Sequence, residues 1–409
     1  SGFFEERHHV SRRIMGMNDK RTIIGLFLSV FLMMIGVGMI VAVMPQRYIA
    51  LSGSPSTVGS LAAAFALTYL LVQFEVGRLA DRYGFKPFLI AGYYICAVAG
   101  ICFYFGQEAL ALIAGRLVQG VGEAPVWSLA PAALALQNPG RPGRLIGGYN
   151  AVLHLGLATG PGAGLLIGRW LPEEAAFAVY AILCFSGGSI LLGTLSQEVA
   201  IRPQTTRRPS MAGILAQLAA DRKPLATLFG AGLYGAGYGA FLTVIPVFLQ
   251  LVKGYDLLGI GMFFSGFYIA IGMAALLTGH LTDRYGQPRI MVAGMLVAGI
   301  AIFMAPALEG GVLASLLILS VLALGSFGVS SLAYLNQMAP TGLKGSYSGI
   351  YFLCWGLGRF CGPRVMGGID AWTAAGVGLR GFGALMTLYV FKLWREVFRR
   401  GSTRKTGRD

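Results

Sequence analysis

A short charged turn separates two apolar runs of the chain, each long enough to cross a bilayer, and the same turn occurs again further along. The first copy, residues 77–87, reads GRLADRYGFKP, and the second, residues 279–289, reads GHLTDRYGQPR. Asp81 and Asp283 are 202 positions apart, and the flanking glycines keep the same interval. A duplicated turn between spanning runs predicts two copies of one helical membrane unit.

The composition favours a membrane protein over a soluble one. Only 12% of the 409 residues are charged and 56% are hydrophobic, whereas about a quarter of a soluble domain is charged. The net charge of +15 gathers in the termini and alternate connections, which hold about 25 of the 32 Lys and Arg residues. This positive-inside pattern predicts that both termini are cytoplasmic, and it argues against a nucleic-acid partner. We expect the protein to lie in a bacterial inner membrane.

The apolar runs predict an all-α integral membrane chain with twelve transmembrane helices in two six-helix bundles. The first span is expected over 22–44, closed by Pro45 and Arg47. The expected segments are a polar N-terminal arm at 1–21, a bundle at 22–195, a linker at 196–223 with a surface helix at 211–220, a second bundle at 224–391, and a basic tail at 392–409.

The composition of the turn has a physical reading. Gly77 and Gly84 let two helix ends approach closely and give the chain backbone angles that other residues avoid. Asp81 is expected to face either the N-terminal end of a neighbouring helix or a nearby arginine. Arg82 and Lys86 suit a cytoplasmic connection.

The turn resembles the G-x-L-A-D-R-x-G-x-K pattern between the second and third helices of the major facilitator superfamily. The resemblance implies the major facilitator fold and a secondary transporter that alternates access between two pseudo-symmetric halves. It also implies that the turns form a cytoplasmic gate. The expected gate residues are Gly77, Asp81, Arg82, Gly84 and Lys86, with Asp283, Arg284 and Gly286 in the second copy.

Ionisable residues occur inside the fourth predicted span. Arg116 and Glu123 are seven positions apart, so they share one helix face about 10 Å apart along its axis. Each costs at least about 2.5 kcal/mol within the bilayer unless it faces a partner or a water-filled cavity. A mutually compensating structural pair is one interpretation. The R-x-x-Q-G-x-G pattern, which includes Gln119, is however similar to the fourth-helix motif of proton-coupled facilitators. The resemblance implies that Arg116 tunes a nearby proton site, and the nearest carboxylate for that role is Glu123, where the family usually has a small residue.

The fifth predicted span contains glycines at four-residue spacing around a proline. Gly156, Gly160, Pro161 and Gly164 predict a close helix crossing and a bend. They resemble the G-x-x-x-G-P-x-x-G-G motif of drug–proton antiporters, although Leu165 replaces the last glycine. The eleventh span repeats the motif at Gly362 and Pro363, and His154 just before the first copy is a further titratable candidate.

The second half carries arginines within its last two spans. Arg364 and Arg380 can reach the membrane boundary, whereas Arg359 is the better candidate to face an anionic ligand. The expected substrate cavity consists of Arg116, Gln119, Glu123 and Arg359.

These features favour a proton-coupled exporter of a small organic molecule, with Glu123 as the point of proton entry. A carrier of an anionic solute or a metal chelate is the alternative, because Arg116, Arg359 and Arg380 lie in the spans. A receptor or scaffold on the same fold is a third possibility. The sequence contains no nucleophile–base set or nucleotide loop, so neither an enzyme nor a cofactor is expected. The five cysteines are not spaced as metal ligands, so no metal site is expected. We expect the protein to be a monomer whose partners are its substrate, protons and membrane lipid.

Overall fold

The computed structural model describes residues 2–52, 59–137, 142–168, 170–172, 174–195, 211–368 and 376–398, and the helices account for nearly all of them. The helices are α1 (Gly2–Ser52), α2 (Gly59–Tyr83), α3 (Phe85–Phe105), α4 (Ala109–Gln137), α5 (Pro142–Gly168), α6 (Ala175–Thr194), α7 (Met211–Ala220), α8 (Arg222–Leu242), α9 (Val244–Leu251), α10 (Leu257–Tyr285), α11 (Gln287–Met304), α12 (Gly310–Met338), α13 (Lys344–Gly368) and α14 (Val377–Phe398), with short 3₁₀ turns at Ala305–Ala307 and Thr341–Leu343.

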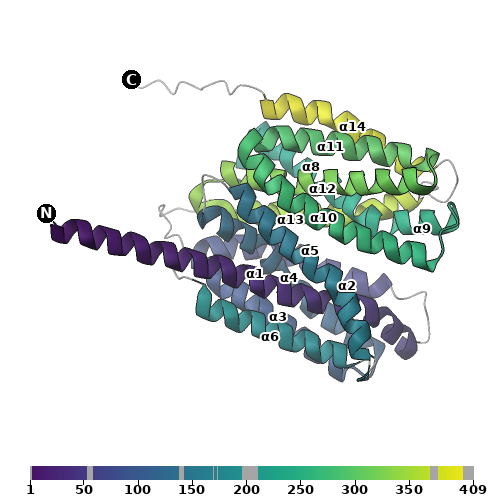
Figure 1. The fold of residues 1–409 in the computed structure, drawn as a ribbon, viewed down its shortest axis with the longest axis horizontal. Helices are drawn as coiled ribbons and strands as arrows, with labels where there is room; N and C mark the ends of the chain where they lie inside the picture. Colours follow the sequence, from purple (N-terminus) through teal and green to yellow (C-terminus); the bar gives the residue numbers. More distant parts are fainter. Residues whose placement is uncertain are drawn as a thin grey trace.

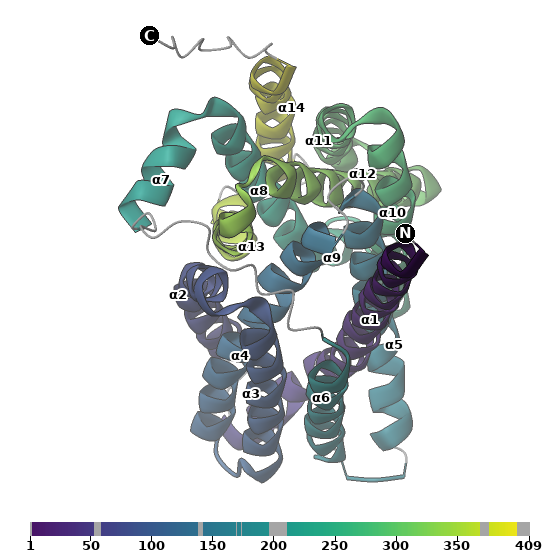
Figure 2. The same cartoon turned by 90° about the vertical axis from the view of Figure 1, so that its left-hand side faces the viewer.

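The helices form two bundles, one from each half of the chain. In Figure 1, α1–α6 lie together in the lower half and α8–α14 in the upper half. Figure 2 shows α7, which occupies the expected surface helix, outside both bundles. Residues 196–210 of the predicted linker and residues 399–409 of the predicted tail fall outside the described residues, whereas α8 begins at Arg222 within the predicted linker.

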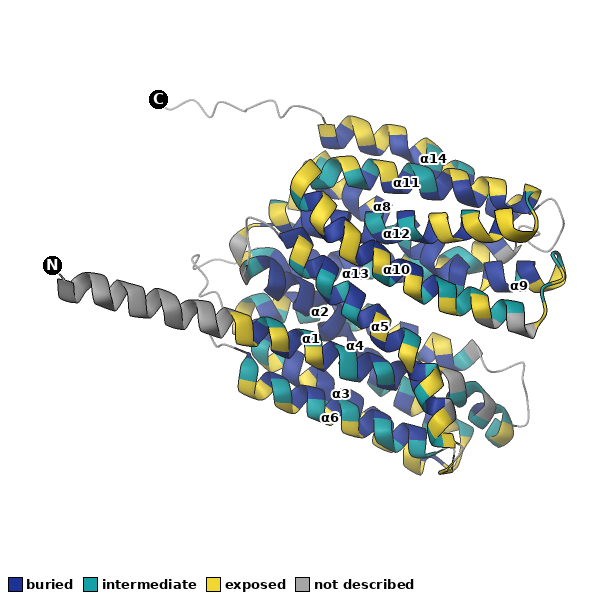
Figure 3. Ribbon diagram, in the orientation of Figure 1, coloured by how far each residue is buried: buried dark blue, intermediate teal, exposed yellow. Residues whose placement is uncertain are grey.

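The outer surface of the bundles is apolar, as a bilayer requires. Large hydrophobic side chains such as Leu71, Leu110 and Phe391 are exposed, and Figure 3 shows the exposed positions along the outer faces. Within the described residues, nine helices are long and apolar enough to cross a membrane. The three long helices outside this set, α4, α13 and α14, are those with Arg116, Glu123, Arg359, Arg364 and Arg380.

Helix α1 is longer than the predicted first span. It runs from Gly2 to Ser52 with Pro45 inside it, so Pro45 does not end the helix. A proline removes one backbone hydrogen bond, and a membrane helix can continue through that gap when neighbouring helices support it. The residues of the predicted N-terminal arm continue the same helix.

The charged turns are also shorter than predicted. Helix α2 extends to Tyr83 and α3 begins at Phe85, which leaves Gly84 as the break between them. Gly84 has φ 89° and Gly286, the break between α10 and α11, has φ 85°. Residues other than glycine rarely adopt these backbone angles, so the glycines make each turn possible. Asp81 and Asp283 therefore lie in the last turns of helices and not in loops.

The glycine motif of α5 packs against α1. A side chain at Gly156 would collide with Met34, and one at Gly160 would meet the backbone of Gly38. Pro161 lies against the same Gly38, and α5 continues as one helix through it. Small residues thus let the two helix axes approach closely, as the spacing predicted.

The second half repeats this crossing between α13 and α8. A side chain at Gly362 would collide with Ala236, and Pro363 lies where a side chain on Gly239 would point. The repeated motif therefore builds the same helix crossing in each half.

We expect Gly160→Leu to destabilise the protein by about 1–3 kcal/mol, because the added side chain has no space between α5 and α1. The thermal unfolding midpoint of the detergent-purified variant should fall. Gly162→Leu is the matched control, since a Cβ atom there meets nothing within 4 Å. Equal midpoints for the two variants would contradict the tight crossing.

Candidate functional site

Asp81 joins the two halves of the molecule. Its carboxylate accepts hydrogen bonds from the backbone N–H of Gly345 (2.8 Å), the backbone N–H of Ser346 (2.7 Å) and the Ser346 hydroxyl (2.6 Å). Gly345 and Ser346 are in the first turn of α13, where free N–H groups and the helix dipole favour a negative charge. This is the first of the two contacts that the sequence predicted for Asp81, and Gly77 allows it by lying directly against Gly345.

Asp283 makes the related contact in the opposite direction. Its Oδ2 accepts a hydrogen bond from the backbone N–H of Arg144 at the start of α5 (3.2 Å). Gly147 and Gly279 bring α5 and α10 together beside it. The two contacts are related by the internal repeat. Asp283 is 202 positions after Asp81, and Ser346 is 202 positions after Arg144. We call the end of the molecule that holds them the contact end.

The basic residues of the turns make contacts within their own half of the molecule. Arg82 stacks on Tyr83 and Arg284 on Tyr285, at 5.0 and 5.3 Å from the ring centroids. Lys86 donates to the carbonyl of Leu195 at the end of α6 (2.7 Å), a contact within one half. Of the predicted gate residues, Asp81, Asp283 and Gly77 contact the other half of the molecule. Gly84 and Gly286 form the breaks between helices, and these contacts of Arg82, Arg284 and Lys86 stay within their own half.

A chain of hydrogen bonds runs along the inner face of α4. Arg116 Nη1 donates to Gln119 Oε1 (2.9 Å), and Gln119 Nε2 donates to Glu123 Oε1 (2.7 Å). Trp127 Nε1 donates to the other carboxylate oxygen, Oε2 (3.1 Å). Gln119 bridges Arg116 and Glu123, so the structure brings these three predicted residues together. Trp127 is a fourth member that sequence reasoning missed, although it continues the same helical spacing.

Glu123 is buried, with 3% of its surface exposed. Ionisable groups on five helices lie close enough to interact electrostatically with its carboxyl group. These groups are Tyr69 on α2, Cys96 on α3, Arg116 on α4, Tyr180 on α6 and Arg359 on α13. A carboxylate in such surroundings can exchange a proton when an access path opens.

His154 lies on α5 and is buried as deeply as Glu123. Its Nδ1 is 2.7 Å from the carbonyl of Asn150, so Nδ1 carries the proton in the neutral ring. Its Nε2 is buried and makes no hydrogen bond within the described structure. The ring contacts Tyr238 of the other half at 6.3 Å between centroids, which places His154 at the interface and not beside Glu123 in the α4 chain.

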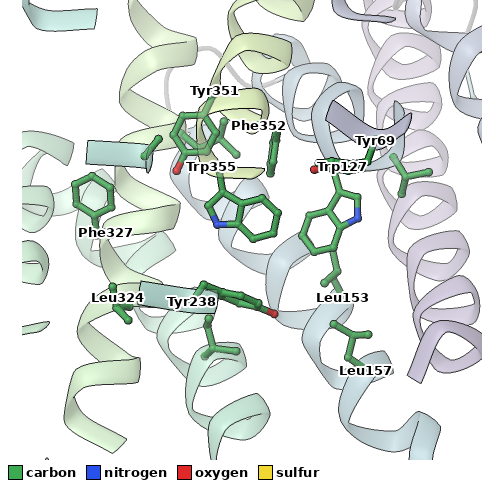
Figure 4. Close-up of a cluster of buried hydrophobic side chains, with 14 of the residues drawn as sticks. Tyr69, Trp127, Leu153, Leu157, Tyr238, Leu324, Phe327, Tyr351, Phe352 and Trp355 are labelled. Carbon is green, nitrogen blue, oxygen red and sulfur yellow. The ribbon is translucent and has the colours of Figure 1, made fainter. Parts of the chain in front are cut away.

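Aromatic side chains from both halves meet at the centre of the molecule (Figure 4). Trp127 of α4 stacks on Trp355 of α13, with centroids 5.5 Å apart and planes at 25°. The aromatic cluster consists of Trp127, Tyr234, Tyr238, Tyr351, Phe352 and Trp355. These rings line a cavity of about 20 Å³ together with His154, which leaves room for about one water molecule. In this conformation the rings fill the space between the halves.

Arg359 lies one helical turn beyond Trp355 on α13 and is half-buried. Its guanidinium sits over the rings of Tyr238, Trp355 and Phe360, at 5.2–5.4 Å from their centroids. In the described part of the chain it forms no ion pair and no hydrogen bond. An arginine within a membrane helix that makes no direct ion pair or hydrogen bond is a candidate for ligand contact.

Comparison with known proteins identifies the family. The family model of the Major Facilitator Superfamily matches residues 26–363. The chain belongs to this superfamily. It is 26% identical to multidrug resistance protein 2 of Bacillus subtilis, over 86% of this chain and 90% of that protein. It is also 26% identical to the class C tetracycline resistance protein of Escherichia coli, over 88% of this chain and 92% of that protein.

A solved structure supports the fold. The E. coli fucose:proton symporter matches with a TM-score of 0.74 at 13% identity, covering 92% of this chain and 98% of that chain. The protein is therefore an integral membrane protein of the major facilitator fold and a secondary transporter, and its family is not one of enzymes. The resemblance predicted from the charged turn is confirmed.

We expect Asp81→Asn to loosen the contact end at least tenfold in population, because hydrogen bonds to a charged acceptor are each worth about 1.5–3 kcal/mol. Turnover should slow more than substrate binding weakens, since the change lies far from the aromatic cluster. Spin-label distances between α2 and α13 measure the population. Asp256→Asn is the control, because Asp256 caps α10 within one half. An unchanged distance distribution and turnover would contradict a role for Asp81 in holding the halves.

Proposed function

We propose that the protein exports a small organic molecule in exchange for protons by alternating access. Its contact end and both termini face the cytoplasm of a bacterial inner membrane, and it acts as a monomer. In this orientation the structure is closed to the cytoplasm, and the Asp81 and Asp283 contacts hold that closure. The proposal is supported by near full-length similarity to two drug-resistance proteins.

One observation carries the proton part of the proposal. Glu123 is a buried carboxylate that accepts two side-chain hydrogen bonds, from Gln119 and Trp127. An ionised carboxylate can accept both, whereas protonation removes part of its accepting capacity. Protonation of Glu123 therefore weakens its hydrogen bond with Trp127. Because Trp127 also stacks on Trp355 of the other half, this loosens a contact between the two halves.

The exchange then follows from two opposing sets of contacts. Protonation of Glu123 loosens the aromatic cluster, and opening towards the cytoplasm requires release of the Asp81 and Asp283 contacts. Proton loss to the cytoplasm restores the carboxylate and its bond to Trp127. A substrate that occupies the centre only when Glu123 is ionised is thereby driven outwards by the inward proton gradient.

Flux in proteoliposomes under an imposed pH gradient tests this function, with ethidium as a cationic probe and 2-naphthoate as an anionic one. Glu123→Gln should abolish the dependence of flux on the gradient, because the amide cannot carry a proton. Glu75→Gln is the matched control, since Glu75 forms an exposed ion pair with Arg78 at 2.6 Å. Gradient-driven flux that survives Glu123→Gln would place the proton site elsewhere. No flux of either probe would favour a receptor or scaffold.

The link between proton and closure has its own matched pair of variants. Trp127→Phe keeps a ring but removes the donor to Glu123, so we expect the pH midpoint of transport to rise by about one unit. Trp355→Phe also loses an indole N–H, but that group makes no hydrogen bond in the described structure. Its midpoint should stay unchanged. Equal shifts in both variants would show that ring size, and not the bond to Glu123, sets the pH response.

Arg359 favours a second candidate, carriage of an anionic solute or a metal chelate. An anion beside Arg359 binds more strongly when Glu123 is protonated, because the nearby negative charge is then neutralised. Proton and anion would therefore move together, whereas exchange requires that proton and substrate exclude one another. Flux of 2-naphthoate in the same direction as protons favours this candidate, and flux in the opposite direction favours export.

A further inference from the structure

A second cavity lies in the C-terminal bundle, apart from the aromatic cluster. It has a volume of about 300 Å³ and is bounded by α9, α10 and α12. Phe263, Phe267, Leu317 and Val321 supply much of its wall, and none of its lining residues is charged. It borders the first part of α10, whereas Asp283 lies in the last turn of that helix, so the cavity is remote from the contact end.

Aromatic rings separate this cavity from the small cavity at the aromatic cluster. Phe267 lines the cavity and also packs edge-on against Tyr238, with centroids 5.3 Å apart. Tyr238 in turn lines the small central cavity. Two aromatic side chains, Phe267 and Tyr238, thus separate the two spaces. Rings that rotate about their side-chain bonds can open such a wall without moving a helix.

Size and lining define what the cavity accepts. A protein cavity of about 150 Å³ lined by Leu, Ile and Phe stays dry and binds benzene. A cavity of about 300 Å³ therefore has room for two rings. Because a buried charge or an unpaired polar group would be costly there, the preferred occupant is neutral and apolar.

We propose that this cavity is a binding subsite for a neutral, apolar group of up to about the size of two rings, in the part of the C-terminal bundle remote from the contact end. Its role as a station for the exported molecule rests on the proposed export function, but its existence as a binding site does not. The apolar group can come from the transported molecule or from a lipid acyl chain. Met262 and Ile318, which line the cavity and are 62% and 46% exposed, place it within reach of the bilayer.

The chain offers a substitution that places a side chain in the cavity. Gly266 lines it, and a Cβ atom at this position meets nothing within 4 Å. Gly266→Leu therefore occupies the space that a ligand would take. Gly193→Leu on α6 is the matched control, because a Cβ atom at Gly193 also meets nothing within 4 Å and the position lies in the other bundle. Ile318→Trp fills the cavity from α12 and serves if Gly266→Leu does not fold.

Binding is measured with N-phenyl-1-naphthylamine, a neutral two-ring fluorophore, by titration of the purified protein in detergent. We expect saturable binding that Gly266→Leu weakens at least tenfold and Gly193→Leu leaves unchanged. Equal binding by all three proteins would overturn the subsite. This readout needs no proton gradient, so it is independent of whether Glu123 carries protons.

Two further arms distinguish the sources of the apolar group. If the subsite serves the transported molecule, the fluorophore inhibits gradient-driven flux competitively, and Gly266→Leu relieves that inhibition. If a lipid occupies it, native mass spectrometry finds a bound phospholipid on the parent protein and on Gly193→Leu that Gly266→Leu lacks. Inhibition that is equal in parent and Gly266→Leu, with no difference in bound lipid, would also contradict the proposal.

Discussion

The contact between Asp81 and the start of α13 is the interaction on which the arrangement of the two halves depends. A carboxylate at a helix N-terminus is held by several N–H groups at once, yet no covalent or deeply buried contact has to break for it to leave. The related Asp283 contact has a different geometry: Asp81 accepts from Ser346 through both backbone and hydroxyl, whereas Asp283 accepts from the backbone of Arg144 at 3.2 Å. The internal repeat thus supplies one such contact in each direction between the halves.

Much of this fold could be predicted because the relevant signals are local or repeated. Run lengths gave the spans, the 202-residue interval gave the two halves, and the small residues around Gly160 gave the α1–α5 crossing. The errors occurred where tertiary packing overrides a local rule. Pro45 is a helix breaker in isolation but lies inside α1, and the charged turns narrow to single glycines because Asp81 and Asp283 bind other helices from helical positions.

Only the part of the site that lies on a single helix could be predicted. Arg116, Gln119 and Glu123 follow helical spacing on one segment, so their proximity can be read from the sequence. The aromatic cluster cannot, because its rings come from α4, α8 and α13, and no rule of spacing joins Trp127 to Trp355 across more than 200 positions. The internal repeat gave no help, since the position equivalent to Trp355 in the first half is Leu153. The chemistry of the centre therefore arose where the two halves differ.

Helix α13 connects the two places where the halves meet. Ser346 at its start holds Asp81, Trp355 closes on Trp127, and Arg359 follows one turn later. Ser346 and Trp355 are about 14 Å apart along one continuous helix, so a shift of this helix as a rigid body alters both contacts together. Reversing a 99:1 preference between two conformations takes about 5.5 kcal/mol, whereas one hydrogen bond to a charged group supplies about 1.5–3 kcal/mol. Neither the bond of Trp127 to Glu123 nor any single bond at Asp81 is enough to switch the molecule. A coupled change at the two contacts of α13, one at Ser346 and one at Trp355, is of the right size, and this explains why a transporter built from two weakly joined halves can still move between two well-defined states.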